Sequence, residues 1–252
     1  MSKMLKNKWV RLVTPVIVVW VYLAVVHLLQ SVLPKSFVIS LLLELGLFLI
    51  PLALNLGWLH QEIGIRTTAH GGRLWRANWY GIYVLILTLA KLFTRVFVKG
   101  HTNNVLNLFI LAMAVGLGEE YVFRGLVLPL AIKAFSGKRQ LFWGVMVSSL
   151  LFGLTHLANL FQQPLLATAE QVLMAFAIGT LLAAVYLKTG NIIFAMVTHA
   201  LQDFQVFLSN VYVQPVLPVA VSVSFVVIVL VIVWLTLRPT KKRTISLAPL
   251  GI

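Results

Sequence analysis

Three short groups of residues, each with at least one ionisable side chain, lie inside long apolar stretches of the sequence. The chain has 252 residues, of which 60% are hydrophobic and only six are Asp or Glu. An ionisable side chain at membrane depth is costly, so a functional role is its default interpretation. Carboxylates and imidazoles are the side chains of acid–base and metal chemistry. The three groups are Glu119, Glu120 and Arg124; Phe152 and His156; and His199 and Asp203.

The first group predicts one paired carboxylate and one free carboxylate. Glu120 and Arg124 are four residues apart, so they share one face of a helix and can form an ion pair. Glu119 is turned by about 100° from Glu120 and cannot use the same Arg equally well. A carboxylate without a partner in a low-dielectric pocket can act as a general base near neutral pH. The alternative is that the Glu120–Arg124 pair is only structural.

The other two groups place one histidine on each of two further helices. Phe152 lies one turn before His156 and can wall the site against lipid. His199 and Asp203 share a helix face, so the carboxylate can orient the imidazole, or the two can present ligands to a metal. Alternatively, His156 hydrogen-bonds a neighbouring helix, and the His199–Asp203 pair packs helices or relays protons in a transporter.

The composition predicts a helical membrane bundle that positions these groups. Charged residues make up 10% of the chain and the mean hydropathy is +0.98, whereas soluble domains are about 25% charged. This excludes a soluble globular protein and a disordered one. The apolar runs reach about 20 residues, enough for a helix to cross a bilayer. Eight spans are predicted: 9–33, 37–60, 79–98, 104–132, 141–159, 165–187, 191–213 and 217–237. We expect an all-α, polytopic bundle.

No linker divides the chain, so it is predicted to form a single membrane domain, 1–252. Within it, we expect 1–103 to be variable flanking helices, 104–213 the core that carries the motifs, and 214–252 the last helix with a basic cytoplasmic tail. The segment 104–132 is too long for one simple helix. We predict that it ends or kinks near Gly116–Gly118, because broken helices at membrane depth usually line a cavity.

Two further ionisable residues, His27 and Glu44, lie within predicted spans. Both stand alone in the sequence, so we interpret them as interfacial or structural. The loop Lys and Arg residues fall mainly on one side, with only Lys35 and Lys99 on the other. By the positive-inside rule, both termini are predicted to be cytoplasmic. The compact chain is typical of a multi-pass protein of a prokaryotic plasma membrane.

The net charge of +14 is attributed to contact with the anionic headgroups of the lipid bilayer. Nucleic acid is not expected as a partner, since no binding motif accompanies the charge. The chain has no cysteine, which excludes disulfides, thiolate metal sites and a Cys nucleophile. The sequence leaves the oligomeric state open.

In order, the motifs Glu-Glu-x-x-x-Arg, Phe-x-x-x-His and His-x-x-x-Asp resemble those of the CPBP family (Abi, or CAAX-protease and bacteriocin-processing) of intramembrane proteases. This family includes the type II CAAX prenyl endopeptidases. The resemblance covers residues 104–213. It implies an endopeptidase that hydrolyses peptide bonds of a membrane-associated peptide or protein. For a bacterial member, it points to bacteriocin self-immunity or peptide maturation.

The resemblance also implies a role for each motif residue. Glu119 would activate the water with help from His156, while His199 and Asp203 would stabilise the oxyanion or complete the site. Glu120, Arg124 and Phe152 would support the structure. Asp203 departs from the Asn of the best-studied endopeptidases, and an ionised Asp cannot donate a hydrogen bond.

A metal-dependent and a glutamate-based mechanism are both open, and the metalloprotease form is slightly favoured. Nitrogen and oxygen ligands for Zn²⁺ are available, although His-Glu-x-x-His is absent. The four ligands would be Glu119, His156, His199 and Asp203. Two other functions remain: a proton- or ion-coupled transporter, for which inverted repeats are not found, and a non-catalytic immunity or scaffold protein.

Overall fold

The structure is a computed structural model that describes residues 7–98, 104–137, 139–209, 217–238 and 245–252. Within these residues, eight helices are long and apolar enough to cross a membrane, which confirms the predicted all-α polytopic bundle. Their bounds are Lys8–Val32, Phe37–Leu59, Trp79–Val98, Val105–Ala134, Gln140–Phe161, Leu165–Thr189, Ile192–Ser209 and Val219–Leu237.

Several of these spans combine α-helix with an irregular turn. The α-helices are α1 (Lys8–Val32), α2 (Phe37–Leu54), α3 (Gly72–Ala77), α4 (Trp79–Phe93), α5 (Val105–Glu120), α6 (Leu128–Ala134), α7 (Gln140–Thr155), α8 (Leu165–Thr189), α9 (Ile192–Ser209) and α10 (Val219–Leu237). Wider π-helical turns cover Asn55–Leu59, Thr94–Val98 and Tyr121–Val127, and 3₁₀ turns cover His156–Phe161 and Ala248–Leu250.

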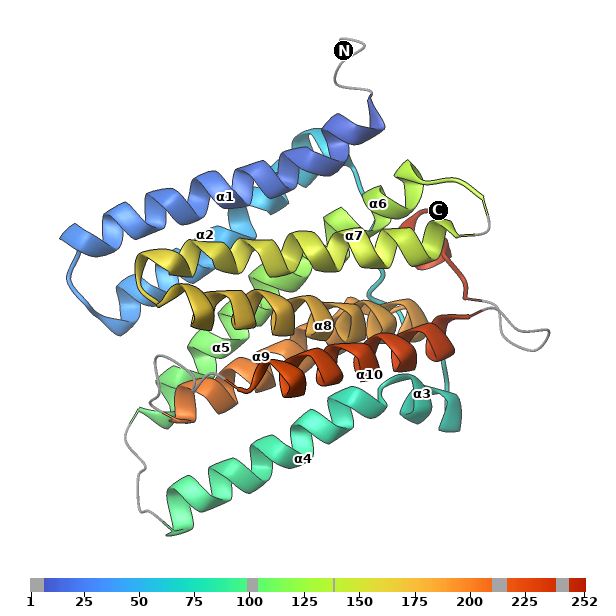
Figure 1. Ribbon diagram of the computed structural model, residues 1–252. Coiled ribbons are helices and arrows are strands. Elements are labelled where there is room, and N and C mark those ends of the chain that lie inside the picture. The colour runs from blue at the N-terminus through green and yellow to red at the C-terminus, as the bar shows by residue number, and fades with distance from the viewer. Residues whose placement is uncertain (1–6, 99–103, 138, 210–216, 239–244) are drawn as a thin grey trace.

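The helices lie roughly side by side, with α8 and α9 in the middle of the bundle (Figure 1). α8 is the most buried of the described spans. It carries small residues, among them Ala177, Gly179 and Ala183, which let neighbouring backbones approach closely, as is usual between membrane helices. The pair α1 and α2 covers one side and α4 lies at the opposite edge.

The helix that carries the two glutamates does not break where the sequence predicted. α5 continues through Gly116 and Gly118 to Glu120, and the irregular part is the π-helix Tyr121–Val127. A Cβ atom on Gly116 would lie 2.7 Å from backbone atoms of α9, and one on Gly118 would lie 3.3 Å from Leu47 of α2. The irregular part therefore begins a few residues later than predicted, and the two glycines serve the close packing of α5 on α9 and α2.

The π-helix links the glutamates of α5 to α7. All its residues from Tyr121 to Val127 are buried. The carbonyl of Phe123 accepts a hydrogen bond of 2.7 Å from Ser148 Oγ on α7. Single π turns inside helices are frequent at functional sites. Here the turn follows Glu120 directly.

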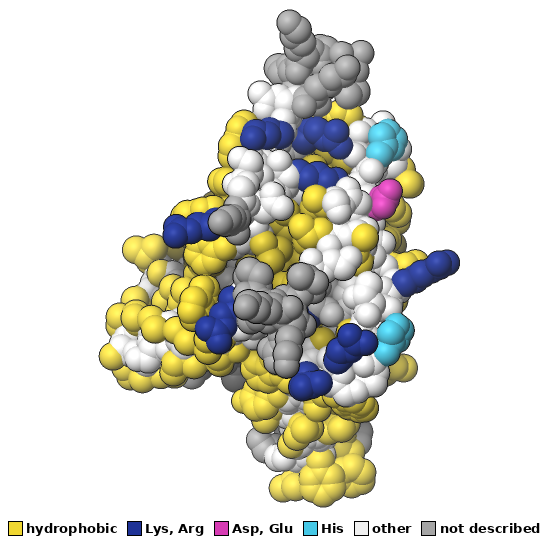
Figure 2. Space-filling view, turned by 90° about the vertical axis from the view of Figure 1, so that its right-hand side faces the viewer, with side chains coloured by type: hydrophobic (Ala, Val, Ile, Leu, Met, Phe, Trp, Pro, Cys, Tyr) yellow, Lys and Arg dark blue, Asp and Glu magenta, His cyan; other side chains and the backbone are white. Residues whose placement is uncertain are grey.

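One end of the bundle is strongly basic. Figure 2 views this end and shows Lys and Arg side chains over much of it, with hardly any acidic side chain between them. It is formed by the start of α1, by α3 and by the ends of α6 and α10 (Figure 1). The asymmetry is the one that the positive-inside rule associates with a cytoplasmic face.

Candidate active site

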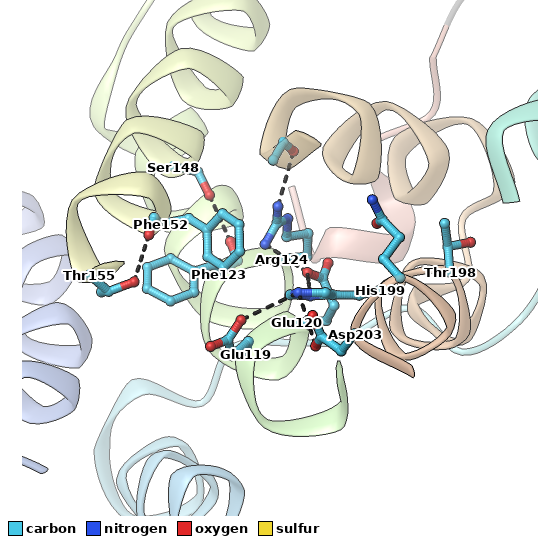
Figure 3. A network of polar contacts seen from close by, with 12 residues as sticks. Glu119, Glu120, Phe123, Arg124, Ser148, Phe152, Thr155, Thr198, His199 and Asp203 are labelled. Atoms are coloured by element: carbon cyan, nitrogen blue, oxygen red, sulfur yellow. Dashed lines mark hydrogen bonds and ion pairs between the residues drawn. The ribbon is translucent and has the colours of Figure 1, made fainter. Parts of the chain in front are cut away.

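The motif residues of α5, the π-helix, α7 and α9 gather at one place in the bundle (Figure 3). Helices α5 and α9 pack directly on each other, because Gly116 brings the backbone of α5 close to Met196 and Ala200. Glu120 lies one turn beyond Gly116 on α5, and His199 directly precedes Ala200 on α9, so this contact brings Glu120 and His199 together. Close helix packing through a glycine therefore positions the polar groups.

Glu120 is the centre of a buried chain of charged contacts. Its Oε1 lies 2.8 Å from Arg124 Nη1 and also 2.8 Å from His199 Nδ1. The side chains of Glu120 and Arg124 are both 0% exposed. The expected Glu120–Arg124 ion pair is thus present, but the glutamate also holds the imidazole of another helix.

Arg124 is fixed by three further features of its surroundings. Its Nη2 donates a hydrogen bond of 3.1 Å to the carbonyl of Gly179 on α8. Its guanidinium lies over the ring of Phe152, 4.5 Å from the ring centre. A Cβ on Gly179 would lie 3.1 Å from Nη2, so the glycine makes room for the guanidinium. A buried cation is tolerated when it is paired and hydrogen-bonded; Arg124 is paired with Glu120 and hydrogen-bonded at Nη2, whereas Nε and Nη1 have no hydrogen-bond partner among the described residues.

The opposite nitrogen of His199 faces the other two acids. Nε2 lies 3.4 Å from Glu119 Oε2 and 3.5 Å from Asp203 Oδ2. Both acids are partly open, with exposed side-chain fractions of 23% for Glu119 and 24% for Asp203. Asp203 Oδ2 itself is buried and has no hydrogen-bond partner. The ring of His199 therefore lies between the fully buried carboxylate of Glu120 on one side and the partly exposed side chains of Glu119 and Asp203 on the other.

Phe152 packs between the charged groups. Its ring contacts His156 at 5.2 Å and His199 at 5.5 Å between ring centres, both edge-on. It also meets the ring of Phe123 at 5.2 Å. The sequence assigned Phe152 to the boundary with lipid, but it is itself buried. Its position between Arg124 and two imidazoles explains why an aromatic ring suits this place.

His156 joins the site less directly than the other motif residues. It lies where α7 gives way to a 3₁₀ turn, and its Nδ1 is 3.3 Å from the carbonyl oxygen of Phe152. It reaches the cluster through the edge of the Phe152 ring. The structure therefore brings Glu119 and Asp203 to the same ring nitrogen of His199 and places His156 beside Phe152.

The side chains do not form a metal site as they stand. Among the described residues, no group of three or more His, Cys, Asp or Glu is arranged to hold a metal ion. His199 uses Nδ1 for Glu120, and the ring contact of His156 is with Phe152 and not with an acid of the cluster. We therefore derive no step through Zn²⁺, and the zinc dependence expected from these residues stays a prediction.

Glu44 is the residue that the sequence interpretation missed. It lies on α2 and interacts electrostatically with both Asp203 and Glu119. Its helix packs on α5, where Leu47 faces Gly118. Its interpretation as an interfacial or structural residue stays a prediction. The sequence offered one indication of a role for Glu44, because an acidic residue inside a predicted membrane span is costly and is usually functional.

Residues 101–205 match the family model described as type II CAAX prenyl endopeptidase Rce1-like. The match is consistent with the CPBP family, and it confirms the resemblance for this segment, which contains every motif residue from Glu119 to Asp203. Comparison with curated proteins and with solved structures found no match.

Proposed function

We propose that this protein is an intramembrane endopeptidase in which Glu119 activates a water molecule and His199 stabilises the oxyanion. One observation carries the proposal: His199 is held at Nδ1 by a buried glutamate and presents Nε2 to two accessible carboxylates. The family match to residues 101–205 supports the reaction class. The substrate is a peptide or protein within the bilayer.

Glu119 is suited to the role of general base because it is the accessible member of the pair on α5. Glu120 is fully buried and engaged by both Arg124 and His199. In the proposed reaction, Glu119 takes a proton from water, and the hydroxyl oxygen attacks the carbonyl carbon of the peptide. The C–N bond then breaks, and the same proton passes from Glu119 to the departing amine nitrogen.

His199 is suited to stabilise the negative charge that develops on the carbonyl oxygen. Each of its two ring nitrogens faces a carboxylate oxygen. Ionised carboxylates only accept hydrogen bonds, so a ring between them donates from both nitrogens. An Nε2–H donor held by Glu120 and Arg124 is preorganised for an oxyanion, which is a large contribution to catalysis.

Asp203 and His156 complete the proposed site. When ionised, Asp203 cannot donate a hydrogen bond, so we assign it the orientation of His199 and not the oxyanion hole. His156 assists at the water from its place against Phe152. For the biological role we keep the sequence-based proposal: bacteriocin self-immunity or peptide maturation in a prokaryotic plasma membrane, with both termini cytoplasmic.

The test is cleavage of a quenched fluorescent peptide with a C-terminal CAAX sequence, offered with and without a farnesyl group. The purified wild-type protein in lipid nanodiscs should cleave at least one of the two. His199→Ala should lower kcat/KM by about 10²–10³, the usual effect of losing one oxyanion donor. His70→Ala, in an exposed loop, is the matched control. Wild-type rates from His199→Ala would overturn the proposal.

A further inference from the structure

A groove of about 360 Å³ opens between α3–α4 and the first half of α9. Its walls are mainly apolar: Leu74, Trp75, Ile82, Phe194, Val197 and Leu201. Helix α4 is attached to α9 beyond the groove, so the groove is a cavity between two helices that are in contact. Farther along, Gln205 Nε2 donates a 2.9 Å hydrogen bond to Thr88 Oγ1, and Lys91 Nζ donates one of 2.5 Å to Ser209 Oγ.

Two polar side chains line this groove, and one of them lacks a partner. Thr198 Oγ1 donates to the carbonyl of Phe194 at 2.6 Å. Asn78 Oδ1 is buried and has no hydrogen-bond partner among the residues that the structure describes. An apolar concavity of several hundred Å³ with a few polar groups is typical of a binding site for a small molecule.

The groove starts at the basic end of the bundle and has the depth of one lipid leaflet. On α9, its lining runs from Ile193 to Leu201, a distance of about 12 Å along the helix. This is a little less than half of the roughly 30 Å hydrocarbon core of a bilayer. Trp75 is exposed at the basic end, where interfacial tryptophans are common, and the exposed cations Arg73 and Arg76 flank it on α3.

We propose that this groove binds one acyl chain of an anionic phospholipid, with the headgroup at Arg73 and Arg76. The apolar walls fit hydrocarbon, the depth fits one leaflet, and the two arginines complement a phosphate. Each basic residue near a membrane surface contributes about 1 kcal/mol toward anionic lipid. The bound chain lies against the face of α9 that carries Thr198 and Leu201, while His199 of the same helix faces α5.

The test uses phosphatidylglycerol with a photoreactive diazirine on one acyl chain, in liposomes containing the full-length protein. After irradiation, mass spectrometry should find cross-links concentrated in residues 74–85 and 193–201. Val197→Phe fills the groove and should lower this labelling about fivefold or more. Val227→Phe, an equally conservative change at an exposed valine of α10, should leave it unchanged.

The headgroup is tested separately, without changing any side chain that lines the groove. The wild-type groove should label about tenfold more with the phosphatidylglycerol probe than with the matched phosphatidylcholine probe. The double variant Arg73→Gln/Arg76→Gln should reduce this ratio to near one. The variant is informative even if Val197→Phe fails to fold.

Three results would overturn the proposal. One is labelling spread evenly over all lipid-facing helices, and another is equal labelling by the two phospholipid probes in the wild type. The third is removal of the label by farnesol but not by unlabelled phosphatidylglycerol, since that would assign the groove to the chain of a prenylated substrate. None of these readouts requires peptidase activity, so the proposal can fail while the proposed function stands.

Discussion

The two sides of His199 differ in exposure and in pairing. On one side, Glu120 is fully buried and binds both Arg124 and the imidazole. On the other, Glu119 and Asp203 are each about one quarter exposed and lie more than 3 Å from the same ring. Neighbouring glutamates of one helix, 119 and 120, thus have opposite surroundings.

This difference shows how one short motif can supply both structure and chemistry. A buried carboxylate with two charged partners is held in place and is unavailable to substrate. A carboxylate with one long contact and access to water can move protons. A rotation of about 100° between consecutive helix residues is sufficient to separate the two roles.

The largest expected effect is on the buried side. Arg124→Gln would leave the buried Glu120 carboxylate with His199 but without the permanent positive charge of the guanidinium, and should lower the free energy of unfolding by about 3–5 kcal/mol. Arg139→Gln, at an exposed arginine, should change it by about 0.5 kcal/mol or less. Denaturation in detergent measures both. Equal stability of the two variants would mean that Arg124 does not neutralise Glu120.

On the open side, the size of the effect depends on what replaces Asp203. Asp203→Leu removes the group that orients His199 and should reduce kcat about a hundredfold, the usual scale for one acid–base group. Asp203→Asn keeps the shape and should retain activity within about tenfold. Steady-state kinetics on the fluorescent peptide separates them. Full activity of Asp203→Leu would remove Asp203 from the mechanism.

Phe152 lies between the two sides, so a change there should affect both moderately. Phe152→Leu keeps most of the apolar volume but loses the ring contacts to His156, His199 and Arg124. We expect a loss of about 1 kcal/mol in stability and a measurable fall in kcat. Thermal unfolding and kinetics on the same sample test this. An unchanged kcat would show that the ring does not position the histidines.

The smallest expected effect is that of a chelator. The mechanism derived from the side-chain geometry uses no metal, so 1,10-phenanthroline should leave the cleavage rate within about twofold, too little to represent a lost Lewis acid. A complete loss that Zn²⁺ restores would establish the zinc dependence expected from the sequence. It would also require the four ligand side chains to rearrange.

Much of the fold could be predicted from hydropathy. Apolar runs of span length identify the eight candidate membrane spans of the described residues, because a lipid-solvated helix has to satisfy its backbone internally and cover it with apolar side chains. The place of the irregular turn could not be predicted. Gly116 and Gly118 suggest a break, yet in the structure they permit contact with α9 and α2. A glycine can either interrupt a helix or allow a neighbouring helix to pack closely, and which of the two occurs depends on whether another helix lies against it.

The only contacts of the site that could be predicted from the sequence are those between residues of the same helix. A separation of four residues gives the Glu120–Arg124 and His199–Asp203 pairs. The contact between Glu120 and His199 joins residues 79 positions apart and depends on how α5 packs on α9. The approach of Glu44 depends in the same way on α2. Neither packing follows from the periodicity of a single helix.

The central claim is that Glu119 performs chemistry while Glu120 maintains structure. It is tested most directly by measuring the cleavage rate and the free energy of unfolding for Glu119→Gln and Glu120→Gln in one preparation. We predict that Glu119→Gln unfolds like the wild type and cleaves about 10³-fold more slowly, whereas Glu120→Gln loses about 3 kcal/mol of stability. A Glu119→Gln protein with wild-type cleavage would contradict the account.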